Sequence, residues 1–155
     1  MNNQQQPKLY PAWRQALSEL LLADLQPGTV IEKTWLEEKF DIKPPNTIAE
    51  AEKNQSVFRF FIWKLREELL KEHRLMLRPI DGVGYRVVES EEQTATALRD
   101  RGEEINRSLS RLMDEISYVQ TDKLDDAARK TNSDAVAKVG TLMGMVKKKL
   151  SFGKD

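Results

Sequence analysis

The apolar positions in the first part of the chain alternate between helical and extended spacing. Between Pro11 and Leu25 they recur every three or four residues, which predicts one buried face of a helix. A Pro-Gly pair ends this segment, and the short β-branched run 29–31 predicts a strand. Helical spacing returns from Lys33 to Phe40. The first part of the chain is therefore predicted to run helix, strand, helix.

A proline-containing break over residues 41–46 precedes a longer helix, because two prolines interrupt helical structure there. Thr47 and Glu50 fit a capping box, in which hydroxyl and carboxylate bond reciprocally to backbone N–H groups. We expect the helix to continue to Glu72 or His73. Its predicted apolar seam is Phe58, Phe61, Ile62, Leu65 and Leu69. We also expect its aromatic side chains to lie mostly in the core, namely Phe58, Phe60, Phe61 and Trp63.

The next segment predicts a β-hairpin. Residues 74–80 alternate in the manner of a strand, Asp81-Gly82 is a strong hairpin turn signal, and residues 85–88 form the return strand. Such a hairpin is either an ordinary closure of a small domain or a wing that contacts nucleic acid. The residues of the hairpin allow both interpretations.

The order of these elements is that of a winged helix-turn-helix domain. The segment KLREELLKEHRLMLRPIDGVGYRVV, residues 64–88, resembles the end of the effector domains of OmpR/PhoB-type response regulators. In that family a recognition helix carries an Arg-Leu-Arg-like segment, matched here by residues 64–66, and a hairpin ends in Gly-x-Gly-Tyr-Arg, matched by residues 82–86. The resemblance implies a DNA-contacting helix and wing. The whole chain is also similar to small bacteriophage proteins that pair such a domain with a helical tail and carry no assigned activity.

From Ser90 onward the pattern changes to heptads. One seam has the alternating spacing of four and three that marks a and d positions: Leu98, Gly102, Ile105, Leu109, Leu112, Ile116 and Val119. After a break near residues 120–122 the spacing repeats at Ala128, Asn132, Ala135, Val139, Leu142 and Val146. Two helices with matching seams predict an antiparallel hairpin. Because such a hairpin buries little surface alone, we expect a homodimer through residues 98–146, with packing on the chain's own winged domain as the alternative.

The predicted fold class is therefore α+β, a winged helix-turn-helix domain followed by a C-terminal helical hairpin. The expected boundaries are a tail over 1–10, the winged domain over 11–89, the hairpin and oligomerisation region over 90–150, and a tail over 151–155. Without cysteine the chain has no disulfide or thiolate metal site, which favours a reducing compartment. The sequence also lacks a long apolar run and a signal-peptide core. We expect a cytoplasmic protein without membrane contact, in the bacterial host cytoplasm if phage-encoded.

Charge limits how the chain could contact nucleic acid. Its net charge is zero, with 13 basic and 13 acidic residues in 1–90 and 12 of each in 91–155. Non-specific binding should be modest, so DNA contact requires a local patch. Residues 53–86 provide one, with eight basic and four acidic side chains.

Candidate DNA contacts lie on the long helix and near the hairpin. Asn and Gln can pair with adenine, Arg with guanine, and Lys or Arg with phosphate. The predicted set is Lys53, Asn54, Gln55, Ser56, Arg59, Lys64, Arg66, Arg78 and Arg86. Polar residues at a helix start are also commonly just solvated, so the alternative is an ordinary surface.

Catalytic chemistry has no visible basis in the sequence. The single histidine, His73, has no ligand partner at metal-binding spacing. Phosphate-binding glycine loops are missing, and the glycines at 82 and 84 precede a strand rather than a helix. We expect no enzyme and no cofactor. The first hypothesis is a sequence-specific double-stranded DNA-binding protein, a phage-type transcriptional regulator acting as a dimer. The alternative is a protein-binding scaffold for host interaction or anti-defence, with a host protein as partner.

Overall fold

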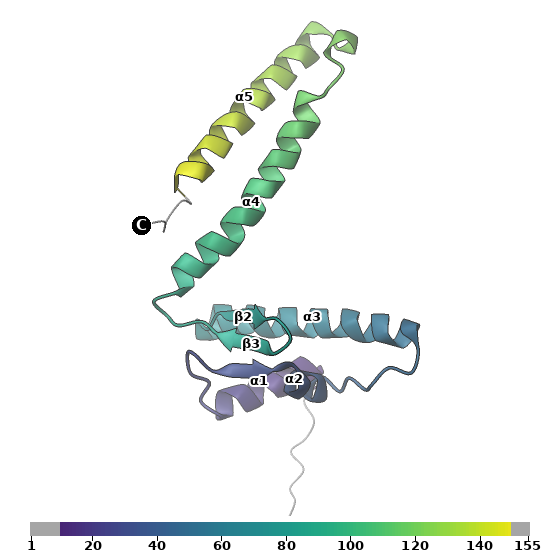
Figure 1. Ribbon diagram of the computed structural model, residues 1–155, viewed down its shortest axis with the longest axis vertical. Helices are drawn as coiled ribbons and strands as arrows, with labels where there is room; N and C mark the ends of the chain where they lie inside the picture. Colours follow the sequence, from purple (N-terminus) through teal and green to yellow (C-terminus); the bar gives the residue numbers. More distant parts are fainter. Residues whose placement is uncertain (1–9, 150–155) are drawn as a thin grey trace, which may run out of the picture. The chain divides into compact units, whose positions relative to one another are not determined.

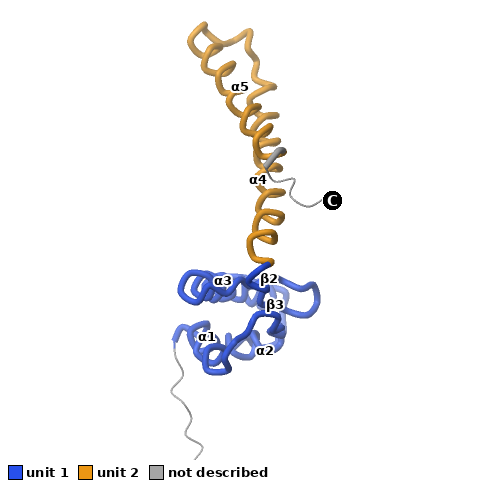
Figure 2. Tube along the Cα trace, turned by 90° about the vertical axis from the view of Figure 1, so that its left-hand side faces the viewer, with its two compact units in different colours: residues 1–91 blue, residues 92–155 orange. Residues whose placement is uncertain are grey.

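The computed structural model describes residues 10–149, with side chains as far as Lys147. The chain divides into two compact units between Glu91 and Glu92 (Figure 2). Apart from Tyr10, the predicted tails over 1–10 and 151–155 lie outside the described residues. The described part contains five α-helices and one three-stranded antiparallel sheet, so the α+β class is confirmed.

The first unit combines three helices with the sheet (Figure 1). Its elements, in chain order, are α1 (Ala12–Leu22), β1 (Val30–Glu32), α2 (Lys33–Lys39), α3 (Ile48–His73), β2 (Leu77–Ile80) and β3 (Gly84–Val87). The helices pack with the inner face of the sheet around one apolar core. The buried residues of that core are Trp13, Ala16, Leu20, Ile31, Leu36, Phe40, Ile62, Leu65, Leu69, Leu77 and Val87.

The sheet has the strand order β1-β3-β2, with both pairs antiparallel. Successive side chains alternate between its faces, so the Leu77–Val87 pair is buried. At Gly84 the backbone φ is +152°, and a Cβ there would lie 2.1 Å from the carbonyl oxygen of Ile31. Only glycine permits the close approach of β3 to the end of β1.

The start of α3 largely follows the predicted capping box. The Thr47 hydroxyl accepts a bond of 3.1 Å from the Glu50 N–H. The Glu50 carboxylate accepts its bond from the Asn46 N–H at 2.7 Å, one residue earlier than the box predicts. The helix thus begins where the sequence places it, with both donors satisfied.

Two predicted boundaries are wrong by a few residues. The first helix ends at Leu22 rather than Leu25, because Asp24 adopts a left-handed φ of +52°. The strand predicted from Arg74 begins at Leu77. Arg74 has a φ of +57° and caps α3, while the following Leu75 N–H donates to the Leu69 carbonyl at 2.9 Å. Residues 74–76, which the alternating pattern assigned to the strand, therefore form the end cap of α3 and the connection to β2.

The second unit is a pair of antiparallel helices, α4 (Gln93–Ser117) and α5 (Asp126–Lys149), joined through a 3₁₀ turn at Thr121–Lys123 (Figure 1). The Asn132 side-chain amide donates to the Ile116 carbonyl at 2.9 Å and fixes the level of one helix against the other. The Asp125 carboxylate accepts from the Ala128 N–H at 2.7 Å and caps α5.

The predicted seam of α4 is partly wrong. Leu98, Ile105 and Leu112 are 37%, 45% and 41% exposed, and Val119 lies beyond the end of the helix. Between residues 99 and 119, all described, the residues that are not exposed are Gly102, Asn106, Leu109, Met113 and Ile116. Along α5, Leu142 is likewise 49% exposed, and Met143 is the partly buried residue. Gly102, Leu109 and Ile116 thus lie in the contact line as predicted, while Asn106 and Met113 take the places predicted for Ile105 and Leu112. The apolar face of α4 is wider than one seam, so the spacing alone does not decide between these neighbours.

Candidate nucleic-acid interface

The N-terminal half of α3 extends beyond the sheet (Figure 1). Residues 47–56 are all exposed except Asn54, which is half-buried. Four of the predicted DNA contacts are therefore accessible in this segment and the next turn of the helix: Lys53, Gln55, Ser56 and Arg59. A projecting helix start has the shape that entry into a major groove requires. Its exposed Glu50 and Glu52 offset the charges of Lys53 and Arg59, so base contacts by the polar side chains matter more here than net charge.

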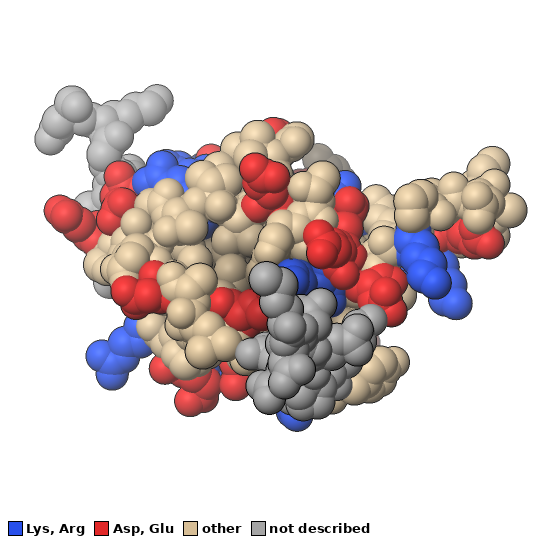
Figure 3. Space-filling model, turned by 90° about the horizontal axis from the view of Figure 1, so that it is seen from below, with Lys and Arg blue, Asp and Glu red and all other residues tan. Residues whose placement is uncertain are grey.

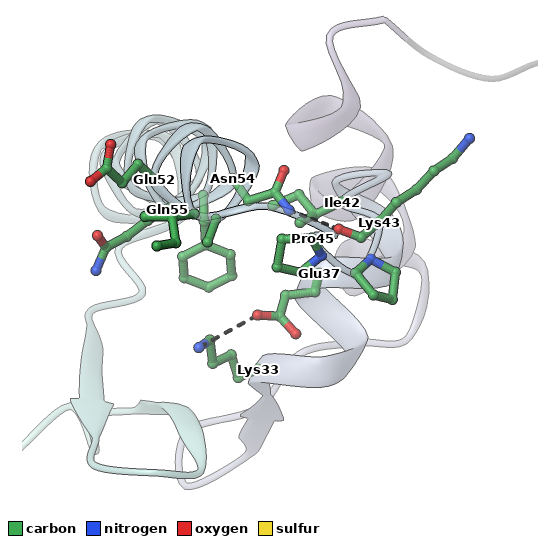
Figure 4. Close-up of a pocket in the computed structure, with 12 residues that line it drawn as sticks. Lys33, Glu37, Ile42, Lys43, Pro45, Glu52, Asn54 and Gln55 are labelled. Carbon is green, nitrogen blue, oxygen red and sulfur yellow. Dashed lines mark hydrogen bonds and ion pairs between the residues drawn. The ribbon is translucent and has the colours of Figure 1, made fainter.

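Asn54 is placed differently from its neighbours. Its side-chain amide donates to the carbonyl of Lys43 at 2.7 Å, which holds the linker between α2 and α3 against the helix (Figure 4). An open groove of about 650 Å³ lies beside this contact, lined by residues of α2, the linker and α3. At its edge the Lys33 ammonium lies 3.4 Å from the Glu37 carboxylate (Figure 4). Asn54 therefore has a structural contact that makes it a weaker candidate for base pairing.

The later basic residues of α3 contact groups of their own chain. The Lys64 ammonium lies 4.4 Å from the Trp63 ring centre and 3.6 Å from the Glu67 carboxylate. The Arg66 guanidinium lies 5.8 Å from the Tyr85 ring centre. The Lys71 ammonium donates to Glu67 at 2.6 Å, which lowers the pKa of Glu67 and raises the pKa of Lys71. An ionised Glu67 thus offsets positive charge late in α3.

Arg78 and Arg86 face each other directly across β2 and β3. Arg78 is exposed and Arg86 half-buried, and their register places both side chains on the sheet face away from the core. The loop at residues 81–83 is short, and its Val83 carbonyl accepts from the Lys33 N–H at 2.9 Å. The hairpin is therefore fixed to the start of α2, and its two arginines form a compact basic pair.

The aromatic residues of α3 do not all enter the core as predicted. Phe58 and Phe61 are half-buried and pack edge-on against Phe40, with ring centres 5.5 and 5.4 Å apart. Phe60 and Trp63 are 52% and 53% exposed. Each residue of a helix is rotated by about 100° from the last, so four aromatic residues within six positions cannot share one face. Phe60 and Trp63 lie on the side of the helix opposite the buried seam, and this spacing is the sequence signal from which their exposure could be predicted.

Other chemistry is limited in the described residues. His73 is exposed at the end of α3, and residues 10–149 contain no cluster of three or more His, Cys, Asp or Glu side chains able to hold a metal ion. Basic and acidic side chains are interspersed over the face seen in Figure 3. Of the helices described, none is both long enough and apolar enough to span a membrane.

No family model, curated protein or solved structure matches the chain. The resemblance of residues 64–88 to winged-helix effector domains therefore stays an expectation from sequence. A function is therefore inferred from the geometry of α3 and the hairpin.

Proposed function

We propose that the first unit is a winged helix-turn-helix module that binds double-stranded DNA. Its element order, with α2 and α3 followed by the β2–β3 hairpin, supports this assignment. In such a module the start of the second helix enters the major groove, and the hairpin lies against the backbone. A transcriptional regulator, of the phage type that the sequence suggests, is the role in which this binding would be used.

The observation that carries the proposal is the exposed, projecting start of α3. Arg59 and Gln55 offer the donors and acceptors that pair with guanine and adenine edges, and Lys53 offers a phosphate contact. Arg78 and Arg86, paired on the outer face of the hairpin, add two positive charges suited to the DNA backbone. Because residues 1–91 carry 13 basic and 14 acidic side chains, attraction to DNA depends on such local groups.

Selection of bound sequences from a random-duplex pool tests the proposal, with affinities measured by fluorescence anisotropy at about 50 and 200 mM salt. We expect an enriched motif that survives the higher salt. Arg59→Ala should weaken binding to that motif by about 1–3 kcal/mol and relax its specificity. Lys53→Ala should weaken all sequences about equally and lower the salt slope, because Lys53 is the exposed lysine of the projecting start.

Arg14→Ala is the matched control, since Arg14 is an exposed arginine on α1 that lies over Trp13 at 5.4 Å. It should leave both affinity and specificity unchanged. Absence of any enriched motif, together with salt-insensitive binding, contradicts the proposal.

A specific observation favours a second candidate, a protein-binding surface on the same helix. Phe60, Trp63 and Leu70 are each about half exposed, at 52%, 53% and 49%, and their spacing places them along one side of α3. Exposed aromatic residues of this size are enriched at protein interfaces and often dominate their affinity. A host protein held there is the partner this surface would suit.

The two candidates make opposite predictions for one variant. Trp63→Ser should abolish capture of a nuclease-resistant protein partner if the second candidate holds, and should leave motif binding intact. Arg59→Ala should do the reverse. Loss of DNA binding in Trp63→Ser, with the fold preserved by circular dichroism, would assign the aromatic side of α3 to DNA.

A further inference from the structure

One side of the second unit carries large apolar side chains that its fold leaves exposed. Leu98, Ile105 and Leu112 are 37%, 45% and 41% exposed, and each is seven residues from the next. Residues seven apart lie along one line of a helix. Ile105 and Leu112 directly precede Asn106 and Met113, which face α5, so the exposed line runs beside the seam of the hairpin.

The second helix adds to the same face. Leu142 and Met145 of α5 are 49% and 53% exposed, and Leu142 directly precedes the partly buried Met143. Viewed from one end, the residue order of two antiparallel helices runs in opposite senses. The residue just before a contact residue therefore lies on the same face of the pair in both helices, so Ile105 and Leu112 of α4 share a face with Leu142 of α5. The bond between Asn132 and the Ile116 carbonyl sets the level. Ten residues after Asn132 in α5 is Leu142, and ten residues before Ile116 in α4 is Asn106, so these two residues lie at the same level.

We propose that this face binds a second copy of the chain, with the two α4 helices packed antiparallel about a two-fold axis near Ser108. Reversing α4 about the midpoint between Ser108 and Leu109 sets Ile105 against Leu112 of the second copy. It also brings Arg101 to within one residue of the level of Glu115 of the second copy, twice in each dimer. The face is thus complementary to itself in both apolar surface and charge.

The arrangement selects one orientation of the two helices. A parallel pairing would place each Arg101 beside the other and each Glu115 beside the other, and like charges at such positions repel. Arg101 also contacts Glu104 of its own helix at 2.6 Å, with both side chains largely exposed. A guanidinium has five donors, so this contact leaves others for Glu115 of the second copy. The small side chain of Ser108 lets the helices approach at the axis.

Charge reversal in the full chain tests the pairing by sedimentation velocity and light scattering. Arg101→Glu and Glu115→Arg should each weaken self-association by at least about tenfold, because each creates two repulsive pairs in a dimer. Mixing the two variants should restore association, since every pair in the mixed dimer again joins an acid and a base. Arg107→Glu is the matched control. Arg107 has the same 71% side-chain exposure as Arg101 and pairs with Glu103 at 3.3 Å.

Disulfide trapping tests the orientation, and the chain's lack of cysteine makes single substitutions unambiguous. Ser108→Cys should oxidise to a covalent dimer, because the two copies meet at the axis. Thr94→Cys should not, since its two copies lie about 40 Å apart at 1.5 Å per residue in the antiparallel dimer. Circular dichroism confirms that each variant keeps its helices.

The proposal is overturned by a monomeric wild-type chain, by a mixture of the charge variants that fails to associate, or by equal trapping at both cysteine positions. None of these results depends on DNA, so failure here leaves the proposed function of the first unit standing.

Discussion

The two units bury their apolar residues to very different extents. In the first unit Leu36, Leu65 and Leu69 are fully enclosed, within a core drawn from three helices and a sheet. Among the side chains described for the second unit, as far as Lys147, Val139 is the buried apolar one, and most of the larger ones stay partly exposed. A two-helix hairpin can cover only one side of each helix. The first unit therefore has a complete core of its own, whereas the second has an apolar face that suits a partner.

The strongest test of this comparison removes one large side chain from each unit. Leu65→Ala should destabilise the first unit by about 3 kcal/mol, because Leu65 is 0% exposed. Leu112→Ala should cost the second unit less than about 1 kcal/mol, measured by circular dichroism at 222 nm at a concentration too low for self-association, because Leu112 is 41% exposed. Urea unfolding followed by tryptophan fluorescence reports the first unit alone, since all three tryptophans belong to it. Equal losses from both variants would contradict the comparison.

A backbone test distinguishes the glycines of the hairpin. Gly84→Ala should cost about 2–4 kcal/mol, because its Cβ would meet the Ile31 carbonyl at 2.1 Å and separate β3 from β1. Gly82→Ala should cost only about 1 kcal/mol, since Gly82 has a φ of +72° with open space around it. The same urea titration measures both. A Gly84→Ala chain as stable as Gly82→Ala would show that β3 does not approach β1 this closely.

The seam of the second unit offers a stabilising change. The Asn106 side-chain oxygen is buried and, within the described residues, has no hydrogen-bond partner. Asn106→Leu should therefore raise stability by about 1 kcal/mol, measured by thermal unfolding at 222 nm. Asn132→Leu is the control and should lower it, because Asn132 donates to the Ile116 carbonyl. A drop in stability for Asn106→Leu would mean that its oxygen has a favourable contact.

The smallest expected change is in the pH dependence of the stability of the first unit. The Lys39 ammonium donates to Glu19 at 2.6 Å and, with Gln15, lowers the pKa of Glu19 below its ordinary 4.5. A lowered carboxyl pKa stabilises the fold above pH 4.5, and the contribution disappears as pH falls through the folded value. Glu19→Gln should thus cost at most about 1 kcal/mol at pH 7 and nothing in strong acid. A penalty independent of pH would indicate lost packing instead.

The sequence predicts those elements whose signals are local. Thr47 and Glu50 identify the start of α3, and Asp81-Gly82 identifies the hairpin, because capping and turn chemistry involve only neighbouring residues. Periodicity also identifies Ile62, Leu65 and Leu69 as core. These signals need no knowledge of the partner elements.

Features that depend on partner elements are predicted less well. The exposure of Phe60 and Trp63 depends on which side of α3 is covered by α1 and the sheet, and the seam of α4 depends on how α5 is rotated against it. The contact of Asn54 joins it to Lys43, eleven residues away, across a linker whose path the sequence does not specify. For the candidate site, residue types and spacing therefore identify α3 but not which of its side chains are accessible.

Mapping of the DNA-binding surface on the full chain tests the proposed role of α3 most directly. Backbone amide chemical shifts, followed during titration with a selected duplex, report which residues contact it. We expect the largest changes at residues 53–59 of α3 and at residues 78–86 of the hairpin. Changes concentrated at residues 60–70, or no saturable change at all, would contradict the assignment of the start of α3 to DNA.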